Sequence, residues 1–188
     1  TFKALLKNPK SDVTVLLITF FLTVIFDLTV AIEVGLLIAC VLFMKRVMET
    51  TDISVIKNEI DPNNESDLEV HEEHLMVPEG VEVYEINGPY FFGIATKFEE
   101  IMSELGDRPK VRIIRMRKVP FIDSTGIHNL TNLCEMSKKE NIHIVLSGVN
   151  EKVHKVLEKA GFYDLLGEDN ICPNINVALE KAKAIVEK

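Results

Sequence analysis

The chain has 188 residues, of which 47% are hydrophobic and 27% charged, and its net charge is −8. It lacks the surplus of Lys and Arg with which nucleic-acid-binding proteins neutralise phosphates, so that class is excluded. The cysteines Cys40, Cys134 and Cys172 lie far apart without CxxC spacing, which indicates neither a disulfide scaffold nor a zinc knuckle.

The charge is unevenly distributed along the chain. Residues 1–48 sum to +2, whereas residues 49–80 carry ten acidic residues and one lysine, and residues 81–188 are nearly neutral. This pattern predicts a membrane segment at 1–48, an acidic linker at 49–77 and a soluble domain at 78–188. Because the chain begins with Thr1 rather than Met, we expect it to be the C-terminal portion of a longer protein.

The segment from Val13 to Met44 is almost entirely apolar. A single helix of this length would run about 48 Å, against about 30 Å of hydrocarbon in a bilayer. A break at Phe26-Asp27-Leu28-Thr29, where Asp27 can cap a second helix, instead predicts a helical hairpin. The alternatives are one tilted anchor and a cleaved signal peptide, and the length of the run argues against the latter.

The residues that flank the apolar segment agree with a hairpin. Lys3, Lys7 and Lys10 precede the segment, and Lys45 and Arg46 follow it. If positive residues mark the cytoplasmic side, both ends face the cytoplasm and the number of passes is even.

One carboxylate, Glu33, lies inside the apolar segment. It is either a functional group in the membrane or a residue that snorkels or pairs locally.

The acidic linker contains the turn sequence Asp61-Pro62-Asn63-Asn64. Before it, the apolar residues of 53–56 form a short strand or pack on the following domain. His71 and His74 have a spacing that would suit metal ligands on a helix, but their acidic neighbours are more typical of a polar loop.

After Pro78, apolar strands alternate with amphipathic helices. A strand at 81–86 and a turn at Asn87-Gly88-Pro89 predict a hairpin whose second strand is 90–94. Further strands are expected at 111–116, 142–146 and, weakly, 170–172, and helices at 95–105, 127–139, after Asn150, and at 175–186. This alternation predicts an α/β domain with a parallel or mixed central sheet covered by helices.

The sequence Asp123-Ser124-Thr125-Gly126 lies where a strand ends and a helix begins. The carboxyl edge of an α/β sheet often holds ligands, and free N–H groups at a helix N-terminus attract anions. A phosphate on Ser124 or Thr125 would be stabilised there. Alternatively, Asp123 or Ser124 only caps the helix and Gly126 eases the turn.

No catalytic arrangement is evident. His128, His143 and His154 lie in separate predicted elements, and no paired carboxylates, Walker loop or dinucleotide fingerprint is present. We therefore expect no catalytic residue, no metal site, no cofactor and no enzymatic activity.

Three stretches of the soluble part resemble a STAS domain, a fold shared by sulfate transporters and anti-sigma-factor antagonists. They are residues 88–93 (GPYFFG), 119–126 (VPFIDSTG) and 146–150 (LSGVN). The apolar hairpin with Phe26-Asp27-Leu28-Thr29, followed by Lys45-Arg46, is similar to the transporter branch. The chain thus resembles the C-terminal end of a SulP-type anion permease, with the last two membrane helices and a STAS domain.

The resemblance implies a secondary active transporter of the sulfate/bicarbonate class in the inner cell membrane, with the STAS domain in the cytoplasm. Its partners would be the lipid bilayer, the remaining membrane domain and a second copy in a homodimer. The transport site would lie in earlier membrane helices. In the antagonist branch the position matching Thr125 carries a phosphorylatable hydroxyl, more usually Ser. The alternative functions are a membrane-tethered phosphorylation switch with a regulatory protein partner, and a nucleotide sensor at residues 123–126.

Overall fold

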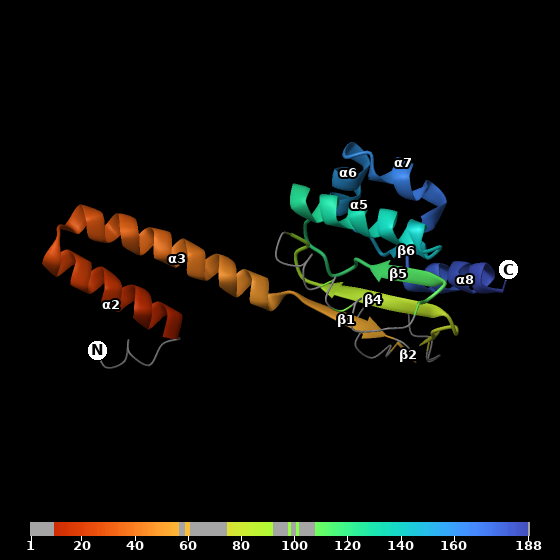
Figure 1. Ribbon diagram of the computed structural model, residues 1–188, viewed down its shortest axis with the longest axis horizontal. Helices are drawn as coiled ribbons and strands as arrows, with labels where there is room; N and C mark the ends of the chain where they lie inside the picture. The colour runs from red at the N-terminus through yellow and green to blue at the C-terminus, as the bar shows by residue number, and fades with distance from the viewer. Residues whose placement is uncertain are drawn as a thin grey trace. The chain divides into compact units, whose positions relative to one another are not determined.

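The computed structural model describes residues 10–56, 59–60, 75–91, 98, 101 and 108–187. The chain divides into two compact units, Thr1–Thr50 and Thr51–Lys188. The first contains a pair of apolar helices and the second an α/β domain (Figure 1).

The apolar unit consists of helices α2 (Lys10–Ile25) and α3 (Leu28–Thr50). The predicted break is confirmed, because the side chain of Asp27 accepts a hydrogen bond from the N–H of Val30 at 3.0 Å and so caps α3. Within the described residues, α3 is the helix long and apolar enough to cross a membrane, over Leu28–Val47. The apolar stretch of α2, Val13–Ile25, is shorter.

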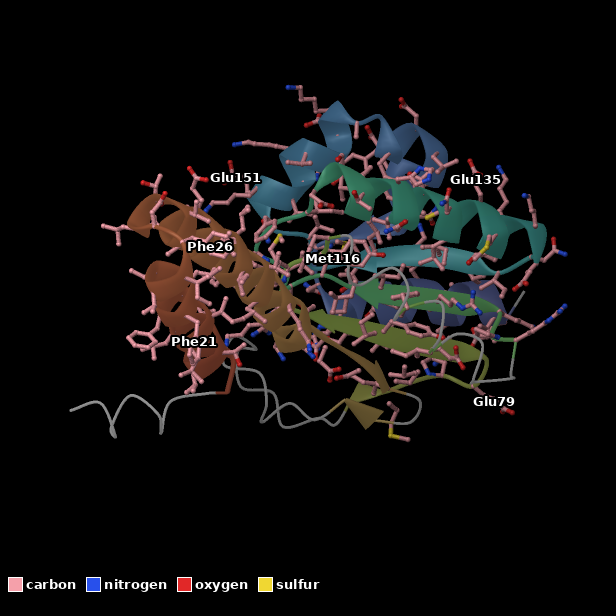
Figure 2. All side chains as sticks on the ribbon, turned by 60° about the vertical axis from the view of Figure 1, so that its left-hand side comes forward. Phe21, Phe26, Glu79, Met116, Glu135 and Glu151 are labelled. Atoms are coloured by element: carbon pink, nitrogen blue, oxygen red, sulfur yellow. The ribbon has the colours of Figure 1, made fainter. Side chains whose placement is uncertain are left out.

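Small residues let the two helices approach closely. Ala31 and Gly35 are one turn apart on α3 and are buried. A Cβ atom on Gly35 would lie 2.6 Å from Oγ1 of Thr19 on α2, so this position requires glycine or a movement of Thr19. Apolar side chains remain exposed away from this contact, as Figure 2 shows for the labelled Phe21 on α2 and Phe26 in the turn between the helices.

The α/β domain is built on a five-stranded sheet of order β1-β4-β5-β6-β7. Its strands are β1 (Asp52–Ile56), β4 (Val81–Asn87), β5 (Val111–Arg115), β6 (His143–Ser147) and β7 (Ile171–Cys172). β1 pairs antiparallel with β4, and the other pairs are parallel, so the predicted mixed sheet is confirmed. The short strands β2 (Glu59–Ile60) and β3 (Leu75–Met76) form a separate ladder.

Helices cover both faces of this sheet, and β4 and β5 are therefore buried along almost their whole length. On one face lie α5 (Ser124–Lys139), α6 (Glu151–Lys159) and α7 (Phe162–Leu166), which Figure 1 shows together. The helix α8 (Ile175–Val186) packs on the other face. A short 3₁₀ turn, η2 (Glu168–Asn170), precedes β7. Met116, labelled in Figure 2, is fully buried in the core of the first face.

One of the two alternatives for residues 53–56 is confirmed, because strand β1 forms there, within the segment 49–77, and its Ile53 is buried in the core. The predicted hairpin after β4 differs from the structure. Tyr90 does not form a hairpin with β4, because β1 and β5 already occupy the two edges of that strand. Tyr90 instead makes a parallel bridge with Ile122.

The helices at 127–139 and after Asn150 were expected to be amphipathic, and their apolar residues are buried in part. Leu130, Leu133, Val153 and Leu157 are buried, whereas Met136 and Val156 are exposed at the margins of their helices. The pair His71 and His74 and most of the predicted helix 95–105 lie outside the described residues.

The burial of Ile53 yields a first prediction. In a chain of residues 51–188, Ile53→Ala is expected to lower the free energy of unfolding by about 2–5 kcal/mol, because a buried side chain is truncated. Val156→Ala, at an exposed position on α6, is the control and should cost less than about 0.5 kcal/mol. Urea unfolding followed by circular dichroism measures both. Equal effects of the two substitutions would show that β1 is not an integral strand.

Candidate functional site

The carboxyl edge of the sheet gathers the beginnings of three helices. A helix that follows a parallel strand runs back across the sheet, so α5, α6 and α8 all begin near the ends of the strands. Each has a side-chain cap. Asp123, Asn150 and Asn174 accept hydrogen bonds from the N–H groups of Gly126 (2.6 Å), Val153 (3.0 Å) and Val177 (3.0 Å).

The predicted loop 123–126 is held against the segment that follows β4. The N–H of Tyr90 donates to the carbonyl of Phe121 at 3.0 Å, and the N–H of Asp123 donates to the carbonyl of Tyr90 at 3.3 Å. Gly126 is buried, and a Cβ there would lie 2.5 Å from the carbonyl oxygen of Tyr90. Gly126 is therefore required by the close approach of these two backbones.

The two hydroxyls of this loop face solvent. Ser124 and Thr125 are exposed in the first turn of α5, which contains no acidic residue, while Asp123 is half-buried. The structure thus confirms Asp123 as the helix cap. A phosphate on either hydroxyl would meet the positive end of the α5 dipole. A regulatory anion or phosphorylation site at Asp123, Ser124, Thr125 and Gly126 remains a prediction.

The other candidate groups take structural positions. Burial raises the pKa of the Cys134 thiol to about 12, and the charge of Glu135 adds to the effect, so the thiol stays protonated. His154 lies 2.5 Å from the hydroxyl of Tyr163, whereas His128 and His143 lie on other elements. Within the described ranges, no three or more His, Cys, Asp or Glu side chains are placed to hold a metal ion.

A group of buried polar residues on β4 and β5 was not predicted from the sequence. Tyr84 donates to Oε2 of Glu82 at 2.6 Å, and Nη1 of Arg112 donates to Oγ of Ser137 on α5 at 3.2 Å. Burial, together with the hydrogen bond to Glu82, raises the pKa of the Tyr84 phenol. The signal was present, since Glu82 and Arg112 each interrupt an apolar strand. These contacts tie α5 to the sheet.

Comparison with known proteins identifies this domain. The family model described as "STAS domain" matches residues 74–178. A crystal structure of a sulfate transporter family protein from Wolinella succinogenes is 40% identical, with a TM-score of 0.60, and the match covers 69% of this chain and 100% of that one.

Two longer proteins match nearly all of the chain. The Bacillus subtilis (strain 168) protein YvdB, whose name proposes a sulfate transporter, is 28% identical over 173 residues, which is 88% of this chain and 29% of YvdB. The anion transporter murine Solute Carrier 26 family member A9 has a similar fold, with a TM-score of 0.72 and 18% identity over 97% of this chain and 30% of its own. The chain therefore spans less than a third of these relatives.

The cap geometry yields a second prediction. Asp123→Ala is expected to lower the free energy of unfolding by about 1 kcal/mol, because the hydrogen bond to the N–H of Gly126 is lost. Ser124→Ala, which alters the exposed neighbouring side chain, should change it by less than about 0.5 kcal/mol. Thermal unfolding compares the two variants, and a larger loss for Ser124→Ala would overturn the assignment of the cap.

Proposed function

The chain belongs to the STAS domain family, and from this premise we propose that it forms the C-terminal part of a secondary inorganic-anion transporter of the sulfate/bicarbonate class. The observation that carries the proposal is the combination of a STAS domain with an apolar helix pair directly before it. Its relatives named as sulfate or anion transporters match both parts together.

In this proposal residues 1–48 supply the last two membrane helices of the transporter. The exposed large apolar side chains of α2 and α3 support this, because a soluble domain would bury such faces. They are Leu17, Ile18, Phe20, Phe21, Val24, Ile25, Leu28, Ile32, Leu36, Leu37, Val41, Phe43 and Met44. The bilayer and the remaining membrane domain of the same transporter would cover them.

Glu33 is the carboxylate inside the apolar segment. It is exposed, and it lies two residues from both Ala31 and Gly35, on the side of α3 away from α2. It is the sixth residue of the span Leu28–Val47, so its carboxylate could reach the membrane surface or pair locally. The alternative is that it meets the earlier membrane helices, which would also contain the transport site.

The STAS domain would lie in the cytoplasm beneath an inner-membrane transporter and would have a regulatory or structural role. The exposed hydroxyls of Ser124 and Thr125 favour regulation through phosphorylation or through a protein or nucleotide bound at this loop. We expect the full transporter to be a homodimer without enzymatic activity.

A transport assay tests the class of function. Cells that express the full-length protein are expected to take up radiolabelled sulfate or bicarbonate faster than cells with an empty vector. The 188-residue chain expressed by itself is the matched control and should give no uptake. Absence of uptake for every small inorganic anion would overturn the proposal.

The loop yields a separate prediction. Thr125→Glu is expected to change uptake by the full transporter while the stability of the domain shifts by no more than about 0.3–1 kcal/mol, because a negative charge suits the N-terminus of α5. Met136→Glu, at an exposed position later on the same helix, provides a comparison for a new charge away from the loop. If Thr125→Glu unfolds the domain, or leaves both uptake and partner binding unchanged, the loop is only a helix cap.

A further inference from the structure

A second feature of the carboxyl edge lies on the opposite face of the sheet from α5. A pocket of about 230 Å³ opens between the ends of β5 and β6 and the beginning of α8. Arg115, Arg117, Ser147, Gly148 and Asn174 are among the residues that line it. The loop 123–126 contributes none of its lining.

Ser147, at the end of β6, is one of the residues that line this pocket. Ser147 is fully buried, with a relative exposure of 0%. Within the part of the chain that the structure describes, its Oγ has no hydrogen-bond partner. A buried hydroxyl without a partner costs about 1–3 kcal/mol, so this hydroxyl is suited to bond to a water or a ligand oxygen in the pocket.

The strand register explains how this hydroxyl meets positive charge. Ser147 on β6 is paired with Arg115 on β5, which is in turn paired with Glu85 on β4. Arg115 is 3% exposed, and its Nη1 lies 3.4 Å from Oε1 of Glu85. Lys118 reaches the other oxygen of Glu85 at 3.4 Å. Glu85 thus contacts Arg115 and Lys118. Arg115 and Arg117 both line the pocket, so two guanidinium groups lie beside the hydroxyl of Ser147.

Helix α8 supplies further donors. Asn174 caps it by accepting from the N–H of Val177, so the N–H groups of the first two helical residues, Ile175 and Asn176, have no acceptor within the helix. They lie at the positive end of a 12-residue helix. Gly148, with a φ of 66°, brings its backbone to the Cβ of Arg117, since a Cβ on Gly148 would lie 3.2 Å from it.

We propose that this pocket binds a tetrahedral oxyanion, a sulfate or phosphate group, through Ser147, the guanidinium of Arg117 and the N-terminus of α8. Donors from three separate segments surround the pocket, which matches an acceptor with several oxygens better than a spherical halide. The proposal rests on the described geometry and not on the proposed transport function. It gives the STAS domain a means of sensing the concentration of such an anion.

Anion binding to the whole chain in detergent micelles tests the proposal. Sodium sulfate and sodium phosphate are titrated by calorimetry at constant ionic strength, with sodium chloride as the control salt. Arg117→Gln is expected to weaken sulfate binding about tenfold or more through the loss of a charge-assisted hydrogen bond. Lys159→Gln removes the same charge from an exposed position in the last turn of α6, outside the pocket lining, and should change the affinity less than about twofold, since salt screens it.

A second pair of variants separates the hydroxyl of Ser147 from general stability. Ser147→Ala is expected to weaken sulfate binding about fivefold, whereas the anion-free protein unfolds at the same or a higher temperature, because an unpartnered buried hydroxyl is removed. The control Ser124→Ala, in the exposed loop of α5, should leave the affinity unchanged.

Saturable binding of either oxyanion, with the expected differences within both pairs, supports the site. Four results would overturn it: no saturable binding, an equal response to chloride, equal losses for Arg117→Gln and Lys159→Gln, or a loss with Ser124→Ala and none with Ser147→Ala. The last of these would move the anion to the loop 123–126.

Discussion

The structure of the α/β domain depends on the burial of β5 on both faces. Every residue of Val111–Arg115 is buried, and parallel neighbours β4 and β6 satisfy its backbone on both sides. A parallel strand in this position requires helices on both faces of the sheet and crossover connections between the strands. The crossovers return each helix across the sheet, so the N-termini of α5, α6 and α8 are brought to one edge. The topology alone therefore brings free N–H donors and the positive ends of three helix dipoles to this edge, whatever the side chains there.

The two faces of that edge differ in chemistry. On the side of α5, the loop 123–126 is closed by Asp123 and by the contact between Gly126 and Tyr90, and it presents hydroxyls to solvent. On the side of α8, the pocket at Ser147 is recessed and lined by arginines. The first arrangement suits covalent modification or contact with a partner, and the second suits a small anion. A domain attached to an anion transporter would thus have two separate inputs, one through regulatory proteins and the other through the anion itself.

Local sequence signals were sufficient for most of the helices and parallel strands. The final helix was predicted with its observed bounds, because its apolar stripe is regular. Asp27 marked the break between α2 and α3 because it is a capping residue within an apolar run. Strand β1 was only one of two alternatives, since its short apolar stretch lies in an acidic segment and its partner β4 is about 30 residues away. The pocket at Ser147 could not be predicted, because its lining comes from three segments that only the sheet register brings together.

The central claim is that the carboxyl edge is the ligand-responsive edge of the domain. Hydrogen exchange of the whole chain in lipid nanodiscs, with and without sodium sulfate, tests this claim most directly. The account predicts slower exchange at residues 115–119, 147–151 and 173–177, with no change at the amino ends of the same strands, residues 81–83, 111–113 and 143–144. A uniform change over the domain, or a change confined to the amino ends, would contradict it.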